Sequence, residues 1–323
     1  MKKSIRSKQT SEVITKVVFI LLFVFLALYA LTMIFTLGWG LLTSLKSRFD
    51  FEMLNNVMGF PNLDSSNMYN SREALFKLAN YKTALENLVI EERKVFYGLG
   101  PDPIVHKCRA GFGEMLVNTL LYTVGGAFIY AVMPAIAAYL CAKYPYKLSG
   151  ILVVIYTLML CMPIVGSTPF ELTFLRNTGL YDSILGNYIQ KMTGGGMYFF
   201  VYLAYFKGTS ETYREAAQLD GASQFRVMFT IYFPLAVKIM ATVFLIQFVT
   251  LWNDYQTPLL YLPTHPTLAY GVYYISFTAL IPALYSTPAR IAGLMMLAIP
   301  IVIIFIIFKD KLMGDISLGG VKE

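Results

Sequence analysis

Apolar residues gather into long, uninterrupted blocks along this chain. No Asp, Glu, Lys or Arg occurs from residue 17 to 45, from 115 to 142, or from 148 to 170. Each block exceeds the roughly 20 residues that a helix needs to cross about 30 Å of hydrocarbon. A soluble core could not cover that much apolar surface, so the blocks predict membrane-spanning helices.

Six spanning helices account for the apolar blocks and predict an all-α integral membrane protein. The fourth is the weakest, because it offers only 15 uncharged residues, from Met192 to Phe206. The uncharged stretch from Tyr255 to Ala289 leaves room for a further re-entrant or spanning segment around 271–286. The predicted spans cover residues 17–41, 115–141, 148–170, 192–206, 236–261 and 290–308.

Composition supports this class of protein and argues against nucleic-acid binding. Hydrophobic residues make up 57% of the chain and charged residues 14%, with a mean hydropathy of +0.59. Soluble domains average about 45–50% and about 25%. The net charge of +7 does not indicate a nucleic-acid partner, because Lys and Arg lie mainly at the ends of apolar blocks.

Cysteine and histidine are too sparse to indicate a metal or redox site. Cys108, Cys141 and Cys161 form no CxxC pair, and His106 and His265 are far apart in the sequence. We therefore expect the cysteines to act as small buried hydrophobic residues and expect no metal site.

The distribution of Lys and Arg predicts how the helices are oriented. With the N-terminus in the cytoplasm, the inner segments carry 14 of these residues and the short outer loops carry 3. This bias predicts a multi-pass protein of the plasma membrane with residues 1–16 and 309–323 in the cytoplasm. The first apolar block is too long for a signal-peptide core, so we expect it to be retained.

Residues 42–114 are expected to form a large extracellular loop, which at about 70 residues is too long to obey the charge rule. Asn70 and Ser71 can cap a helix within it. This helix either packs on the outer ends of the spans or forms a docking surface for a protein outside the cell. It would include the regularly spaced Leu75, Leu78, Leu85 and Leu88.

The inner segment between the fourth and fifth spans, residues 207–235, predicts a helix, a turn and a second helix. Ala216 and Ala217 are strong helix formers with little bulk. Gly221 tolerates the positive φ at which one helix stops and the chain reverses. Ser223 can cap the next helix, and Pro234 lies near the entry to the fifth span.

This segment closely resembles the EAA signature of ABC importer permeases, which is Glu-Ala-Ala, three residues, Gly, nine residues and Ile-x-Leu-Pro. Glu215-Ala216-Ala217, Gly221, Ile231 and Pro234 fall in register, and Phe233 replaces the usual Leu. The run Asp220-Gly221-Ala222-Ser223 is similar to that of the carbohydrate-uptake, maltose-type subfamily.

Other segments resemble the same subfamily in order and spacing. The resemblance covers most of the chain except residues 83–110, which look like an insertion. At the C-terminus, Gly320 stands where the subfamily has Ala, and the chain ends in Glu323 instead of Gly. The matching segments are Asn118-Thr119-Leu120, Ala137-Ala138-Tyr139, Trp252-Asn253-Asp254 and Gly319-Gly320-Val321-Lys322.

The resemblance implies a type I ABC importer permease in which the EAA segment is a coupling helix seated in a cleft of an ATPase subunit. The implied coupling residues are Glu215, Ala216, Ala217, Asp220 and Gly221. The alternative is that these residues only cap and pack a hairpin. The implied partners are a second permease subunit, two ABC ATPase subunits, an extracellular solute-binding protein and membrane lipid.

The chain itself is expected to bind no cofactor and to catalyse no reaction. It has no GxxxxGK[ST] phosphate loop, so ATP and Mg²⁺ would be bound by the ATPase partner. Gly194-Gly195-Gly196 is not followed by Lys, and we interpret it as a flexible start to the fourth span or a point of close backbone approach.

Trp252, Asn253, Asp254 and Tyr255 are candidates for lining a substrate pathway. An acidic residue inside an apolar block is a functional candidate because its burial is costly. Asp254 lies about 24 Å beyond Lys238, however, which places it near the outer interface, where a carboxylate can meet water. The two aromatic residues could stack on a sugar or belong to an interfacial aromatic belt. Both interpretations remain open.

Three other functions were weighed against sugar import. A secondary transporter or channel would need carboxylates at mid-membrane or a polar pore lining, which the charge-free spans do not offer. A membrane enzyme would show clustered His, Asp or Cys. An ABC permease for a peptide, amino acid or phosphate differs only in subfamily, so the resemblance alone favours a sugar or oligosaccharide.

Overall fold

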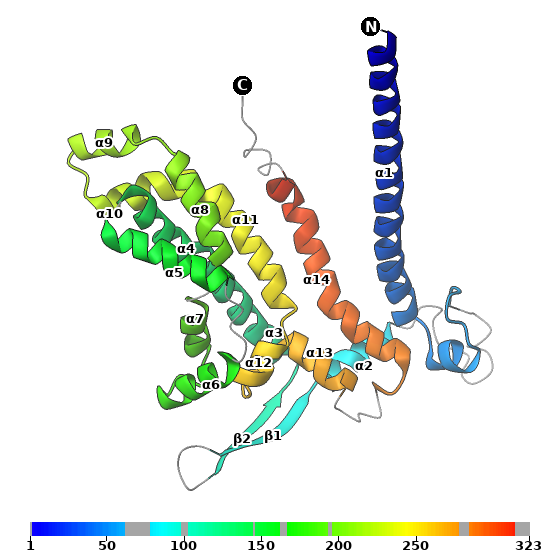
Figure 1. The fold of residues 1–323 in the computed structure, drawn as a ribbon. Helices are drawn as coiled ribbons and strands as arrows, with labels where there is room; N and C mark the ends of the chain where they lie inside the picture. The colour runs from blue at the N-terminus through cyan, green and yellow to red at the C-terminus, as the bar shows by residue number, and fades with distance from the viewer. Residues whose placement is uncertain are drawn as a thin grey trace. The chain divides into compact units, whose positions relative to one another are not determined.

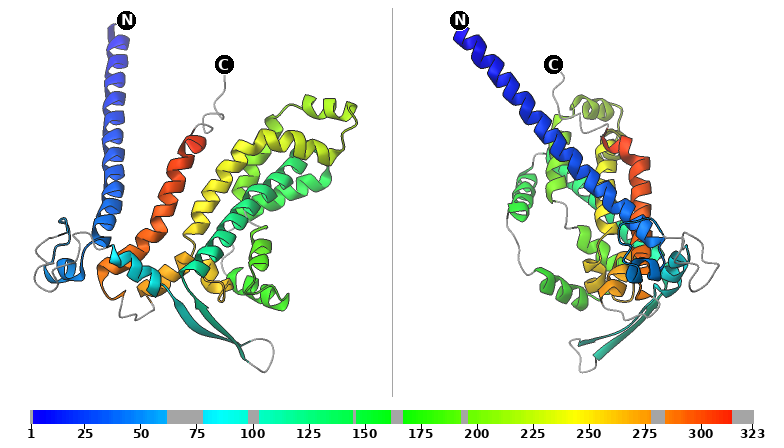
Figure 2. Two further views of the ribbon diagram at one scale, coloured as in Figure 1. Left: turned by 180° about the vertical axis from the view of Figure 1, so that it is seen from behind. Right: turned by 90° about the vertical axis from the view of Figure 1, so that its right-hand side faces the viewer.

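The computed structural model describes residues 2–61, 78–97, 103–144, 146–161, 167–192, 196–277 and 284–313. The chain divides into two compact units, whose elements are labelled in Figure 1 and seen from two further sides in Figure 2. The first unit comprises Met1–Leu85 and Leu280–Met296, and the second comprises Glu86–Ala279 and Leu297–Glu323.

Helices dominate both units. The first unit contains α1 (Lys2–Ser44), the π-helical turn η1 (Phe49–Met53), most of α2 (Ala79–Asn87) and the start of α14 (Thr287–Met313). The second contains β1 (Ile90–Tyr97), β2 (Pro103–Ala110), α3 (Phe112–Leu120), η3 (Leu121–Gly125), α4 (Gly126–Lys143), α5 (Lys147–Cys161), α6 (Ser167–Asn177), α7 (Ile184–Met192), α8 (Gly196–Gly208), α9 (Thr212–Leu219), α10 (Gln224–Val227), η4 (Met228–Tyr232), α11 (Phe233–Trp252), α12 (Gln256–Tyr261) and α13 (Leu268–Phe277).

Four stretches of helix are long and apolar enough to cross a membrane. They correspond to the predicted first, second, fifth and sixth spans, and they confirm the predicted helical membrane fold. The apolar side chains of the first stretch are almost all exposed within the chain, as expected for a helix that faces lipid or other subunits, whereas the second stretch also contributes to the buried core. The stretches are Ile14–Ser44, Phe112–Lys143, Gln224–Trp252 and Thr287–Ile304.

Several predicted boundaries differ from the described helices. The fifth predicted span was taken to residue 261, but α11 ends at Trp252 and α12 starts anew at Gln256. The Asp254 carboxylate accepts a hydrogen bond from Thr257 N at 3.1 Å, so it caps the new helix instead of continuing the old one. The third predicted span ended at residue 170, whereas α5 ends at Cys161 and α6 begins at residue 167.

Two shorter helices bear on the remaining predictions. The described part of the weak fourth span is α8, which has 13 residues. The extra segment expected around 271–286 is occupied in part by α13, a short apolar helix of 10 residues. Whether either one crosses the bilayer stays a prediction.

A β-hairpin in the predicted insertion was not foreseen. β1 and β2 pair antiparallel from Ile90 opposite Ala110 to Tyr97 opposite Pro103. The first pair is fully buried, so the base of the hairpin is held in the second unit. Part of the expected loop helix is present as α2, which contains Leu85 but neither Leu78 nor Leu88. Asn70, Ser71 and Leu75 lie outside the described residues, as do Gly194, Gly195 and the C-terminal residues 314–323.

The first unit is held by polar contacts to the backbone at the end of α1. Lys46 is buried, and its amine donates to the carbonyl oxygens of Asn56 and Val57 at 2.7 and 3.2 Å. Asn80 of α2 donates to the carbonyls of Ser44 and Lys46, both at 2.8 Å. The bonds from Asn80 satisfy carbonyl groups at the end of α1, where a helix leaves such groups without partners.

The core of the second unit forms where α4, α8 and α11 pack together (Figure 1). Ala131, Ala135 and Ala138 place a strip of small residues on one face of α4, which lets the neighbouring helices approach closely. Aromatic rings fill the space at the end of this strip. The Tyr139 ring lies 5.6 Å from that of Phe206 and 5.1 Å from that of Tyr232.

The Asp182 carboxylate joins two turns of the second unit, its own and the one at Thr264. Asp182, which has a φ of +58°, accepts hydrogen bonds from Thr264 N at 3.0 Å and Thr264 Oγ1 at 2.7 Å. His265 Nδ1 lies 3.5 Å from Asp182 Oδ1. The hydrogen bond to Asp182 raises the pKa of His265 above its ordinary value, although burial acts against this. The protonated imidazole therefore strengthens the link between the turns.

The Asp182–His265 pair predicts a pH-dependent stability. Because the pKa of His265 is raised on folding, the pair stabilises the protein fully below the unfolded pKa of about 6.5. This contribution is lost as pH rises through the higher folded value. We expect His265→Gln to lower the melting temperature more at pH 6 than at pH 8.5. In an Asp182→Asn background the same substitution should show no such pH dependence, and an equal loss at both pH values would contradict the pairing.

Candidate functional site

The segment from α9 to η4 has the helix, turn and helix that the sequence predicts (Figure 1). Gly221 takes a φ of +76°, which an L side chain rarely adopts, and so allows the chain to reverse after α9. Ser223 Oγ accepts a hydrogen bond from Arg226 N at 3.4 Å and caps α10. Local sequence thus determines the shape of the segment.

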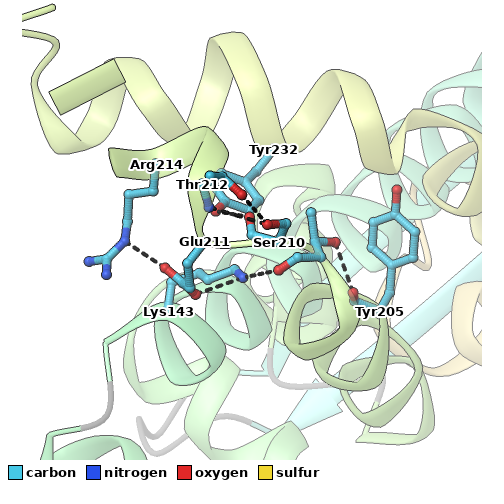
Figure 3. Close-up of polar contacts among 8 residues, drawn as sticks. Lys143, Tyr205, Ser210, Glu211, Thr212, Arg214 and Tyr232 are labelled. Atoms are coloured by element: carbon cyan, nitrogen blue, oxygen red, sulfur yellow. Dashed lines mark hydrogen bonds and ion pairs between the residues drawn. The ribbon is translucent and has the colours of Figure 1, made fainter. Parts of the chain in front are cut away.

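A buried lysine attaches this segment to the helix bundle (Figure 3). Lys143, at the end of α4, donates to Glu211 Oε1 at 2.9 Å and to the carbonyl oxygen of Thr209 at 2.7 Å. Glu211 precedes α9 and also accepts from Arg214 Nε at 2.8 Å. Tyr232 of η4 donates to the carbonyl of Ser210 at 3.3 Å. α4, α9 and η4 therefore meet at one polar cluster.

Burial makes the ion pair more than a surface contact. The Lys143 side chain is 1% exposed and that of Glu211 is 44% exposed. An amine removed from water in this way needs a charged or hydrogen-bonding partner. The Lys143 amine also lies 5.0 Å from the centre of the Tyr232 ring, a favourable cation–π distance. Sequence analysis missed both Lys143 and Glu211, because nothing in their spacing indicates that they meet.

The charge state of Glu211 follows from its partners. Burial alone would raise its pKa, but the hydrogen bonds and charges of Lys143 and Arg214 lower the pKa below its ordinary value. Glu211 is therefore a carboxylate at neutral pH, and the cluster retains its two charge-assisted hydrogen bonds.

The predicted coupling residues divide between two faces of the segment. Ala217 is buried against the bundle core. Glu215, Ala216, Asp220 and Gly221 are exposed. The exposed side of the segment also carries large apolar side chains. Exposed apolar patches of this kind mark sites of protein contact. These are Tyr213, Leu219 at 90% exposure and Phe225 at 76%.

The four candidate pathway residues do not converge on one site in this conformation. Trp252 is buried, and its indole nitrogen donates to the carbonyl of Leu297 at 3.1 Å, so it presents no ring face to a cargo. Asn253 is exposed and donates to Val249 O at 2.9 Å. Asp254 accepts from Tyr122 Oη at 2.6 Å. Tyr255 is half-buried and stacks on the Tyr273 ring at 4.3 Å.

Within the described residues, no three His, Cys, Asp or Glu side chains lie close enough together to hold a metal ion. The Cys141 side chain is buried as expected, whereas that of Cys161 is exposed at the end of α5.

Comparison with known proteins identifies one family. Residues 131–312, more than half of the chain, match the family described as the inner membrane component of binding-protein-dependent transport systems. The melibiose/raffinose/stachyose import permease MelC of Bacillus subtilis (strain 168) is 26% identical over 216 residues, 66% of this chain and 78% of that protein. The probable starch degradation products transport system permease AmyC of Thermoanaerobacterium thermosulfurigenes is 28% identical over 257 residues, 76% of this chain and 81% of that protein.

A solved structure has the same fold. A chain from a bacterial ABC transporter involved in the import of the acidic polysaccharide alginate superposes with a TM-score of 0.66 at 20% identity. The match covers 91% of this chain and 96% of that one. It confirms the predicted type I permease fold.

The Lys143–Glu211 pair predicts an unequal effect of removing its two members. Glu211→Gln leaves a buried ammonium without its carboxylate, whereas Lys143→Met leaves a half-exposed carboxylate that keeps Arg214. We expect Lys143→Met to cost about 1–3 kcal/mol of stability and Glu211→Gln to cost more. Thermal unfolding of the purified protein measures both. Equal losses, or a larger loss for Lys143→Met, would contradict the proposed role of burial.

Proposed function

Since the chain belongs to the family of binding-protein-dependent transport system inner membrane components, we propose that it is the permease subunit of an ATP-driven importer for a sugar or oligosaccharide. An extracellular solute-binding protein would deliver the cargo, and the permease would pass it into the cytoplasm. The observation that carries the proposal is an exposed helix, α9, attached to the helix bundle through the buried Lys143.

The cargo class is supported by the relatives. The two described above are named for melibiose, raffinose and stachyose and for starch degradation products. Two more are named for diacetylchitobiose in Streptomyces coelicolor and trehalose in Mycobacterium tuberculosis, both 24% identical to this chain. The proposed cargo is therefore a saccharide.

The proposed partners follow from the missing phosphate loop and from the exposed surfaces of the chain. We propose that two ABC ATPase subunits bind ATP and Mg²⁺, because the sequence has no phosphate loop. Their docking site would be the exposed side of the segment from α9 to α10, which presents Glu215 and Ala216 together with the apolar Tyr213, Leu219 and Phe225. A second permease subunit would cover part of the exposed apolar surface of the spans.

The contacts of the segment indicate how motion would pass to the membrane helices. When the ATPase subunits close on ATP, α9 is displaced. Lys143 and Glu211 transmit that displacement to α4, and the Tyr232–Ser210 bond transmits it to η4 and α11. α4 lies in the second predicted span, and α11 lies in the fifth. The two spans would therefore move together between inward- and outward-facing states.

The orientation and the cargo pathway remain parts of the proposal. The Lys and Arg bias supports cytoplasmic N- and C-termini, which also places α9 on the cytoplasmic side. The break at 253–255 between α11 and α12 supplies exposed or half-buried polar groups from Asn253, Asp254 and Tyr255. We propose that these groups lie along the cargo pathway. Trp252 would line the pathway only in a conformation in which its side chain has left the buried contact with Leu297.

The turn at Gly221 provides a direct test of coupling. Proline cannot adopt the φ of +76° found there, because its ring fixes φ near −65°. We expect Gly221→Pro to abolish the stimulation of ATP hydrolysis by the loaded binding protein in a reconstituted complex. Gly208→Ala is a matched control, since Gly208 has a negative φ and open space at its Cβ position.

Charge reversal on the exposed face tests the docking of the ATPase. Glu215→Lys alters neither the Lys143 cluster nor the bundle core, because Glu215 is exposed. We expect this variant to assemble poorly with the ATPase subunits in a pull-down while the permease itself remains folded. Normal assembly together with undiminished ATPase stimulation, in both this variant and Gly221→Pro, would refute the coupling role.

A further inference from the structure

α7 is attached to the second predicted span by two side chains that are one helical turn apart. Tyr188 donates from its hydroxyl to the carbonyl oxygen of Leu121 at 2.6 Å. Lys191 places its amine 3.2 Å from the Tyr122 hydroxyl and 4.3 Å from the centre of the Tyr122 ring. Lys191 is 5% exposed and Tyr122 is 1% exposed, so this contact is buried.

The backbone of the second span is shaped to receive these side chains. Leu121 and Tyr122 lie in η3, a π-helical turn, which changes the normal hydrogen-bonding pattern of the helix. A Cβ at Gly125 would lie 2.1 Å from the Tyr188 hydroxyl oxygen. A Cβ at Gly126 would lie 3.0 Å from both Cδ and Cε of Lys191. The two glycines therefore make the room that α7 requires.

The contact continues to the break between α11 and α12. Tyr122 donates to Asp254 Oδ2 at 2.6 Å, and Asp254 Oδ1 accepts from Thr257 N at 3.1 Å. Lys191 and Asp254 attract each other electrostatically across the Tyr122 hydroxyl. A buried ammonium with one hydroxyl partner gains stability from such a carboxylate nearby. Lys191, Tyr122 and Asp254 thus form one chain of polar contacts across three elements.

We propose that Lys191 is a positioning residue for transport. Through Tyr122 it holds Asp254, and with it the start of α12, while Tyr188 and Lys191 together make α7 move as one body with the second span. This inference rests on the proposed function, and it adds a second link to the one at α9. The α9 cluster would drive the second span, and this chain of contacts would pass the movement to α7 and α12.

The geometry also changes the role expected of Asp254. Its two oxygen atoms already accept hydrogen bonds from Tyr122 and Thr257. These two bonds fix the orientation of the carboxylate between η3 and α12. Asp254 therefore acts first on the shape of the break at 253–255, beside which Asn253 is exposed and Tyr255 is half-buried.

Lys191→Met tests the proposal because it removes the charge and keeps the length of the side chain. The full complex, reconstituted in proteoliposomes with its ATPase subunits and binding protein, is assayed for uptake of radiolabelled raffinose and maltotriose. We expect uptake and binding-protein-stimulated ATP hydrolysis to fall at least about fivefold, the lower end of typical coupling effects. Basal ATP hydrolysis should stay unchanged, whereas a loss of folded protein would lower all three.

A double-mutant cycle shows whether Lys191 acts through Tyr122. Tyr122→Phe removes the hydroxyl that joins Lys191 to Asp254, so Lys191→Met should add little in that background. Lys147→Met is the matched control, because Lys147 is exposed at the start of α5, and it should leave uptake unchanged. Multiplicative losses in the double variant, or uptake by Lys191→Met equal to wild type, would overturn the proposal.

Failure of the proposed function can be recognised separately. If the wild-type complex takes up neither raffinose nor maltotriose and its ATP hydrolysis is not stimulated, the proposed importer role fails. The same double-mutant cycle is then measured from the melting temperatures of the purified proteins. Non-additive losses for Lys191→Met and Tyr122→Phe would support the chain of contacts, and additive losses would overturn it.

Discussion

A buried ammonium at the end of a membrane helix is the interaction on which this account depends. Lys143 is withdrawn from water, so it must keep Glu211 and the Thr209 carbonyl as partners. Those partners belong to the segment that leads into α9. The cost of separating them ties the exposed helix to the bundle, and in the proposed mechanism a force applied to α9 would reach α4 through this attachment.

The rest of the second unit makes that attachment effective. Alanines on one face of α4 bring α8 and α11 close, and the Tyr139, Phe206 and Tyr232 rings fill the end of the bundle next to Lys143. Near the middle of the same span, Gly125 and Gly126 admit two side chains of α7. Small residues thus determine where neighbouring helices are packed tightly, and polar contacts join the elements at two points along the span.

Sequence alone predicted the membrane class and the helix–turn–helix around Gly221 from local signals, namely uninterrupted apolar blocks, an alanine pair and a glycine at a reversal. The permease fold was implied by the resemblance of residues 215–234 to the EAA signature. Sequence analysis missed the Lys143–Glu211 pair and the contacts of Lys191, because partners separated by 60 or more residues leave no periodic signal in one sequence. It also missed the hairpin at 90–110 and the helix break at Asp254, where a side-chain cap outweighs an apolar run.

The most direct test of the central claim is a cross-link from the exposed face of α9 to the motor that is proposed to move it. A cysteine at Ala216, in a chain whose three native cysteines are replaced, is treated with a bifunctional reagent in the assembled complex. The account predicts a covalent product with an ABC ATPase subunit, and labelling in intact cells only by membrane-permeant maleimides. Labelling of intact cells by an impermeant maleimide, without any ATPase product, would contradict it.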